Sequence, residues 1–162
     1  MSQENSVLEL GTIEREMHVD ATPEVVYEVL SRPEHLREWW PDDAVLDGEG
    51  AGAAGEIVFG ERGRPDAKVE QLIVVEVRPP RTFAFRWTHP AGEVATAENS
   101  LLVTFELEPA GTGTRVRMTE TGFREQGWEV AVLEQRYADH VSGWGHFLPR
   151  LAAYAGLLAA RP

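Results

Sequence analysis

The sequence predicts an α+β fold in which a curved antiparallel sheet of about six strands packs against one long C-terminal helix. Three observations predict it. A strand and two short proline-led helices come first, five strand-like runs follow, and the last thirty or so residues show helical apolar periodicity. The sheet and the terminal helix each have an apolar face, and both faces are buried if the sheet curls around the helix. We expect one domain, residues 12–162, after a polar leader, residues 1–11.

The first strand and the first helix are indicated by alternation and by capping residues. Residues 12–20 alternate in polarity, which is typical of a half-buried strand, although Arg15 falls on the otherwise apolar face. Thr22, Pro23 and Glu24 then have the composition of a helix start, and an apolar stripe continues through Leu30.

The second helix is short because prolines stand at both of its ends. Pro33 opens it, and Pro41 disfavours the helical conformation for the residue that precedes it. We therefore expect Trp40 in the exit turn, directly after Trp39. One of these two indoles is predicted to pack beneath the helices and the other, with Trp40 favoured, to lie at a cavity mouth. The alternative that both plug the end of the fold stays open.

The central part of the chain predicts consecutive antiparallel hairpins. Residues 47–56 are rich in glycine and alanine, which predicts a flexible loop. The two aspartates before this loop, residues 42 and 43, predict a solvated turn. Short segments with turn composition then separate five strand-like runs, residues 56–61, 67–77, 81–89, 98–108 and 114–122.

The C-terminal stretch, residues 128–160, predicts the long helix. Apolar residues recur at three- and four-residue steps, from Trp144 through Leu151 to Leu158. Gly143, Gly145 and Pro149 interrupt the pattern. We therefore predict a kink, or a short helix over residues 129–140 before the main one.

The faces that alternation turns inward are mostly apolar, but each carries one polar residue. These residues are Arg15, His89, Asn99 and Glu120. His89 and Asn99 fit strand ends that reach solvent. A buried charge is costly unless it is paired, so Arg15 and Glu120 are predicted either to pair with each other or to line a cavity.

Composition excludes several classes of function. The net charge of −12 argues against nucleic acids and anionic membrane surfaces as partners. There is no cysteine, no signal peptide and no apolar run long enough to insert into a membrane, so we expect a cytoplasmic protein. The five histidines form no metal-binding motif, and no nucleophile or nucleotide-binding fingerprint is present. No metal and no cofactor are expected.

Four segments together resemble a known family. They are "ATPEVVYEVLSRPEHLREWWP", "VEVRPPRTFAFRW", "LLVTFELEPAGTGTRVRMTETGF" and "SGWGHFLPRLAAY". In this order they are similar to the C-terminal domain of the activator of heat-shock-protein-90 ATPase, within the START-like (SRPBCC) superfamily. The resemblance extends over residues 12–158. It implies a helix-grip fold, with a cavity between the curved sheet and the C-terminal helix, and the two short helices closing one end.

The resemblance leaves the function open, because members of this superfamily include ligand binders, enzymes and co-chaperones. The first hypothesis is a binder of a small, largely apolar ligand, aromatic or lipid-like. Its predicted ligand-binding residues are Arg15, Trp39, Trp40, Phe59, Phe85, Trp87, His89, Asn99, Glu120 and Trp144.

Two alternatives remain beside it. One is an enzyme of the cyclase, dehydratase or hydrolase type, with Glu120 or His89 as general acid or base. The other is a stress-related, co-chaperone-like interaction domain. Assembly into a homodimer is compatible with each of the three.

Overall fold

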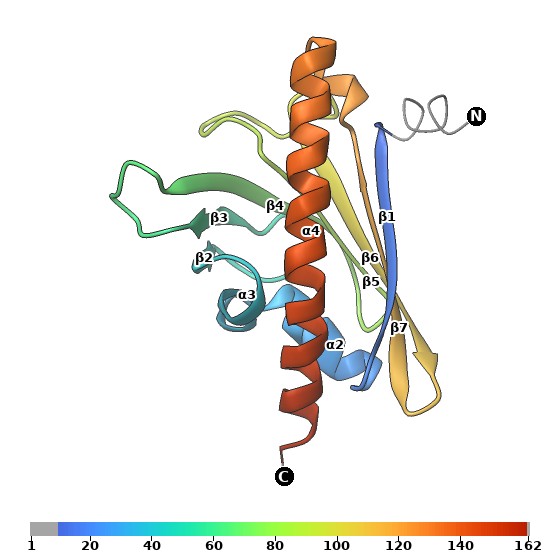
Figure 1. Ribbon diagram of the computed structural model, residues 1–162. Coiled ribbons are helices and arrows are strands. Elements are labelled where there is room, and N and C mark those ends of the chain that lie inside the picture. The colour runs from blue at the N-terminus through green and yellow to red at the C-terminus, as the bar shows by residue number, and fades with distance from the viewer. Residues whose placement is uncertain (1–9, 162) are drawn as a thin grey trace, which may run out of the picture.

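The computed structural model describes residues 10–161, which form a seven-stranded antiparallel sheet and four helical segments (Figure 1). The strand order across the sheet is β1-β7-β6-β5-β4-β3-β2. The strands are β1 (Thr12–Val19), β2 (Asp43–Leu46), β3 (Ala54–Phe59), β4 (Lys68–Arg78), β5 (Thr82–Trp87), β6 (Leu101–Ala110) and β7 (Gly113–Thr121). The helical segments are α2 (Pro23–Ser31), α3 (Pro33–Trp39), the 3₁₀ helix η1 (Arg124–Gln126) and α4 (Val130–Ala159).

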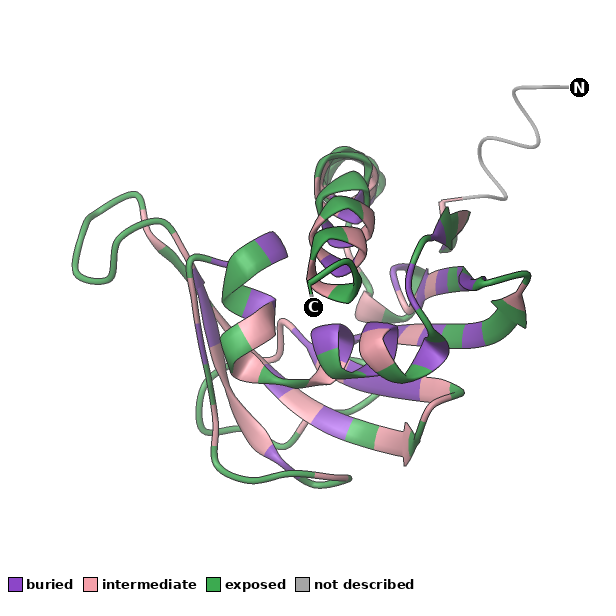
Figure 2. Cartoon of the chain, turned by 90° about the horizontal axis from the view of Figure 1, so that it is seen from below, coloured by how far each residue is buried: buried purple, intermediate pink, exposed green. Residues whose placement is uncertain are grey.

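Helix α4 runs across the concave face of the sheet, which confirms the predicted helix-grip architecture (Figure 1). Figure 2 shows the helix almost end-on, with exposed residues along its outer side. Its buried residues are Leu133, Trp144, Leu148, Leu151 and Ala155, which follow the predicted apolar stripe. The core therefore lies between this stripe and the inward residues of the strands.

The predicted separate helix over residues 129–140 is wrong, because α4 is one helix from Val130 to Ala159 with Pro149 inside it. Pro149 and Gly145 are exposed, so they lie off the buried stripe. Proline in a helix costs about 3 kcal/mol and glycine about 1 kcal/mol. Burying side chains such as Trp144 and Leu151 contributes about 1.5–3 kcal/mol each, which outweighs those costs.

The sheet has one strand more than the sequence predicts. The additional strand, β2, begins at Asp43, in the segment expected as a solvated turn, and its Ala44 pairs with Ile57 of β3. Arg37 of α3 donates hydrogen bonds to the Asp43 carboxylate at 3.2 Å and to the Ala44 carbonyl at 2.8 Å. Both the pairing and these contacts depend on how α3 and β3 pack against the segment, so local alternation over four residues does not indicate the strand.

The two short helices form where their capping residues predict. The Thr22 hydroxyl accepts a hydrogen bond from the Val25 backbone N–H at 3.3 Å, which caps α2. Helix α3 ends at Trp39, and Trp40 is its C-cap residue with non-helical backbone angles. Among the helices of residues 10–161, none has the length and apolarity needed to cross a membrane.

Candidate functional site

A cavity of about 450 Å³ lies where the sheet, the end of α3 and the middle of α4 meet. Its lining comes from the α3 C-cap, from the β3–β4 hairpin, from the end of β5 and from three turns of α4. The lining residues are Trp40, Phe59, Gly60, Asp66, Lys68, Glu70, Trp87, Arg136, Asp139, His140, Gly143, Trp144 and Phe147.

Five tryptophan and phenylalanine residues line the cavity, and the ring of Trp40 contacts three of the others. The centroid of the Trp40 ring lies 5.1 Å from that of Trp87, 5.5 Å from Trp144 and 6.1 Å from Phe59. The ring centroid of Phe147, on α4, lies 5.8 Å from that of Phe59. Aromatic pairs at such distances pack favourably beyond their buried area, so the wall is a preformed apolar surface.

The adjacent tryptophans have different environments. Trp39 is almost fully buried, and its indole N–H donates to the Val29 carbonyl at 3.0 Å, which fastens α3 to α2. Trp40 stacks on the Trp39 ring at 5.8 Å and presents its ring to the cavity. The exit turn before Pro41 allows the two side chains to take these different roles.

A fully buried carboxylate, that of Glu120 on β7, lies beneath this wall. It accepts hydrogen bonds from the Trp87 indole N–H at 2.7 Å, the Trp144 indole N–H at 2.8 Å and His140 Nδ1 at 2.9 Å. Both indole groups are donors only, and an ionised carboxylate is an acceptor only. The arrangement therefore compensates a buried negative charge with three N–H groups from β5 and α4.

The mouth of the cavity carries charges of both signs. Asp66, Lys68 and Glu70 lie on the β3–β4 hairpin, and Arg136 and Asp139 lie on α4. Burial raises the pKa of Glu70 above its ordinary value, and the nearby positive charges of His140, Lys68 and Arg136 oppose this shift. The cavity thus combines apolar walls with a polar mouth, which is typical of small-molecule sites.

The raised pKa of Glu70 predicts a pH-dependent stability effect. The folded state holds the Glu70 proton more tightly than the unfolded state, so this residue's contribution to stability falls as pH rises from the ordinary glutamate range. Glu70→Gln is therefore expected to gain stability relative to the wild type between about pH 4 and about pH 7. Urea unfolding of the wild type and the variant at both pH values measures this difference in stability. Glu98→Gln, at an exposed position, is the control. A wild-type advantage that grows with pH would contradict the prediction.

Of the ten residues predicted for the site, four line the cavity: Trp40, Phe59, Trp87 and Trp144. Three others support it from behind. Phe85 is buried with its ring 5.5 Å from that of Trp40, Trp39 stacks on Trp40, and Glu120 bonds Trp87 and Trp144.

Arg15 does not take part in the cavity, and it does not pair with Glu120. Its side chain is exposed on the edge strand β1 and donates to the neighbouring Glu14 carbonyl. On β1 the residue paired with Glu120 is Ile13, and on β6 it is Val103. A long side chain on an edge strand can reach water. The charge of Arg15 is therefore not buried, although alternation places this residue on the inward face of β1.

His89 and Asn99 lie outside the cavity because their strands are shorter than predicted. Strand β5 ends at Trp87, and Thr88 then takes a left-handed backbone angle, φ 73°, that ends the extended conformation before His89. His89 Nδ1 is buried without a hydrogen-bond partner, and burial lowers the pKa of this histidine. Asn99 precedes β6 and instead holds the loop, accepting from the Thr96 N–H at 2.7 Å and donating to the Val94 carbonyl at 2.9 Å.

Sequence reasoning missed His140, Glu70 and Phe147. A signal for two of them exists on α4, since His140, Trp144 and Phe147 are spaced four and three residues apart and so share one helix face. The expected break near residue 140 obscured this spacing. Within residues 10–161, no group of three or more histidine, aspartate or glutamate side chains is arranged to hold a metal ion.

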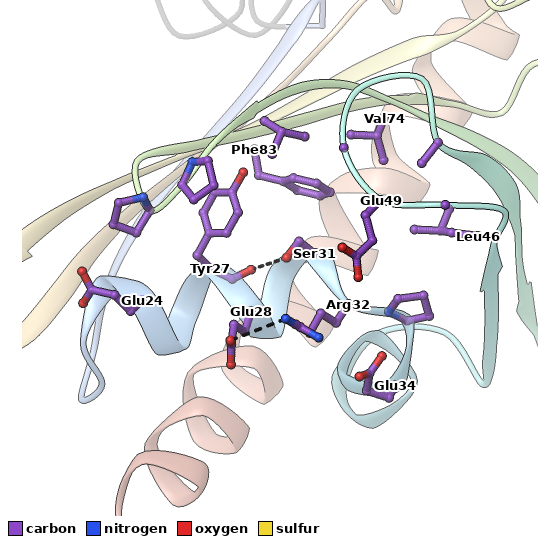
Figure 3. A pocket seen from close by; sticks show the side chains of 17 residues that line it. Glu24, Tyr27, Glu28, Ser31, Arg32, Glu34, Leu46, Glu49, Val74 and Phe83 are labelled. Atoms are coloured by element: carbon purple, nitrogen blue, oxygen red, sulfur yellow. Dashed lines mark hydrogen bonds and ion pairs between the residues drawn. The ribbon is translucent and has the colours of Figure 1, made fainter.

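A second cavity, of about 670 Å³, lies on the far side of α2, between that helix, the β2–β3 loop and the β4–β5 turn (Figure 3). Several of its polar groups already serve the fold. The Tyr27 hydroxyl donates to the Thr82 carbonyl at 3.0 Å, Ser31 donates to the Tyr27 carbonyl at 2.7 Å, and Glu28 pairs with Arg32 at 3.8 Å. We therefore place the candidate site at the aromatic cavity.

Comparisons with known proteins agree with this fold. The family model that matches the chain, over residues 20–156, describes an Activator of Hsp90 ATPase homolog 1-like protein. Protein MLL2253 from Mesorhizobium loti is 23% identical with a TM-score of 0.69, and the match covers 93% of this chain and 99% of that one. The Aha1 dimer from Colwellia psychrerythraea is 21% identical with a TM-score of 0.65, covering 90% and 96%.

DynU16, from the dynemicin biosynthetic locus, is 21% identical with a TM-score of 0.63, and the match covers 94% of this chain and 49% of that protein. At these identities the likeness to solved structures shows the fold alone. No curated protein matches the chain by sequence.

Proposed function

The chain belongs to the Activator of Hsp90 ATPase homolog 1-like family, and on that premise we propose that it binds a small, largely apolar aromatic molecule between the sheet and α4. One observation carries the proposal: Trp40, Phe59, Trp87, Trp144 and Phe147 surround a cavity of about 450 Å³. Flat aromatic ligands gain both buried apolar area and ring contacts in such a place.

The expected affinity is modest for a small probe. A two-ring aromatic that buries roughly 200 Å² at ~25 cal/mol per Å² gains about 5 kcal/mol, which corresponds to a dissociation constant on the order of 0.1 mM. Hydrogen bonds between the physiological ligand and the polar groups at the mouth would make the binding free energy more favourable and lower the dissociation constant.

The proposal is tested by titrating the protein with naphthalene while following the tryptophan indole N–H signals in ¹H–¹⁵N NMR spectra. The signals of Trp40, Trp87 and Trp144 are expected to shift. Phe147→Ala removes part of the wall and is expected to weaken binding about fivefold or more, whereas Leu157→Ala, at an exposed position of the same helix, leaves it unchanged. Absence of any shift up to the solubility limit would overturn the proposal.

The enzymatic alternative stays a prediction, but the two residues first considered for it are poorly placed for direct chemistry. Glu120 is fully buried and already accepts three hydrogen bonds, and His89 is not among the residues that line the cavity. A general acid or base must come within hydrogen-bonding reach of the reacting group.

The interaction alternatives also stay predictions. A structural neighbour from Colwellia psychrerythraea is described as a dimer, and the family takes its description from an activator of Hsp90 ATPase. The aromatic cavity is what ranks ligand binding above these alternatives.

A further inference from the structure

At the aromatic cavity, Nε2 of His140 takes part in none of the hydrogen bonds described above. The His140 side chain lines the cavity and is 18% exposed. Its Nδ1 is bonded to Glu120, while Nε2 makes no hydrogen bond to any residue of the described chain. This atom is therefore available to a molecule in the cavity.

The hydrogen bonds around Glu120 decide which His140 nitrogen carries the proton. Glu120 Oε2 accepts from Trp87, and Oε1 accepts from both Trp144 and His140. Because the two indoles can only donate, both oxygens already act as acceptors, as they do in a carboxylate. His140 then donates from Nδ1. The uncharged imidazole presents an unprotonated Nε2, whereas the protonated form, whose positive charge acts on Glu70, presents Nε2–H. The cavity thus holds an oriented hydrogen-bond acceptor next to its aromatic wall.

The charges that face His140 limit which donor can approach. Carboxylates come from β7 (Glu120), from the β3–β4 hairpin (Asp66, Glu70) and from α4 (Asp139), whereas Lys68 and Arg136 supply the positive charges. Negative groups outnumber positive ones, so an anionic ligand is disfavoured at this end of the cavity. An uncharged O–H group meets no such repulsion.

We infer that His140 Nε2 is the hydrogen-bond acceptor of the cavity, and that the ligand is an uncharged hydroxy-aromatic compound, a phenol or an enol, whose O–H donates to that nitrogen. Glu120 is the positioning residue, because its carboxylate holds the imidazole in the required tautomer. The inference rests on the proposed function and adds to it the ligand class and the residue that selects it.

The test compares three probes of nearly equal shape: naphthalene, 2-methoxynaphthalene and 2-naphthol. The wild-type protein is expected to bind 2-naphthol about two- to tenfold more tightly than the other two, the range of one hydrogen bond between neutral groups. His140→Phe keeps an aromatic wall and is expected to bind all three equally. His18→Phe, at an exposed histidine of β1 outside the cavity, is the matched control and keeps the preference.

Glu120→Gln separates a positioning role from simple packing. The new amide can donate to Nδ1 in place of the contact with the Trp144 indole N–H, which moves the imidazole proton to Nε2. Nε2–H donates to a hydroxyl oxygen and to a methoxy oxygen alike, so the preference for 2-naphthol over 2-methoxynaphthalene is expected to disappear while naphthalene still binds. Long-range ¹H–¹⁵N NMR spectra of the histidine rings report the tautomer directly, with Nδ1–H expected in the wild type and Nε2–H in Glu120→Gln.

Equal wild-type affinities for the three probes, or an Nε2–H tautomer in the wild type, would overturn this inference while leaving the proposed function intact. Failure of all three probes to bind would overturn both. Because the tautomer is measured on the wild-type protein, the inference remains falsifiable even if Glu120→Gln does not fold.

Discussion

Replacing Glu120 with alanine is expected to lower the free energy of unfolding by about 4 kcal/mol. The change leaves two buried indole N–H groups and the His140 N–H without their acceptor, and it opens a void in the core. Equilibrium unfolding in urea, followed by circular dichroism, measures the effect.

Two variants distinguish this mechanism from loss of a surface charge. Glu120→Gln retains an acceptor oxygen and nearly the same volume, so we expect a cost of about 1–2 kcal/mol. Glu106→Ala removes a carboxylate from an exposed position of β6 and is expected to change stability little. If Glu120→Ala cost less than about 1 kcal/mol, the three hydrogen bonds would not be a major source of stability.

Trp40→Ala is expected to destabilise the protein by about 4 kcal/mol and to abolish naphthalene binding. The Trp40 side chain is 5% exposed and contacts the rings of Phe59, Phe85, Trp87 and Trp144. Its removal therefore leaves a void at the point where α3, the sheet and α4 meet. Urea unfolding and the naphthalene titration measure the two consequences.

Trp128→Ala is the matched control, since Trp128 is half-buried beyond the cavity and packs against the Arg136 guanidinium, 5.6 Å from its ring centroid. We expect a smaller loss of stability and retained naphthalene binding. Equal losses of stability in the two variants would show that Trp40 has no special place in the core. Retained binding in Trp40→Ala would remove it from the site.

Sequence patterns located the aromatic part of the site well, for a physical reason. Alternation along a strand decides which side chains share a face, and Phe85 and Trp87 are turned inward as alternation predicts. Likewise, Pro41 forces the exit turn that separates the environments of Trp39 and Trp40. Both rules are local, so they can be read without knowing the rest of the fold.

Which polar residues belong to the site depends on where each strand ends and on what packs against that strand. His89 shares the alternation of β5 but falls beyond the turn at Thr88, and Arg15 faces inward on an edge strand that leaves it exposed. Its place near a predicted strand end sets His89 apart from Glu120, but no local pattern distinguishes Arg15 from Glu120. Only the register across β1, β7 and β6, with α4 laid over it, makes Glu120 fully buried.

Capping, alternation and helical spacing act over a few residues, so local patterns predict the order of the main elements and the inward aromatic residues, and the resemblance of four segments predicts the family. Three other features follow from packing between elements: α4 continues through Pro149, β2 joins the sheet, and His140 Nδ1 lies 2.9 Å from a Glu120 carboxylate oxygen. These features depend on burial and on hydrogen bonds between distant segments. The candidate site was therefore predictable as an aromatic cavity, but its buried carboxylate–histidine pair was not.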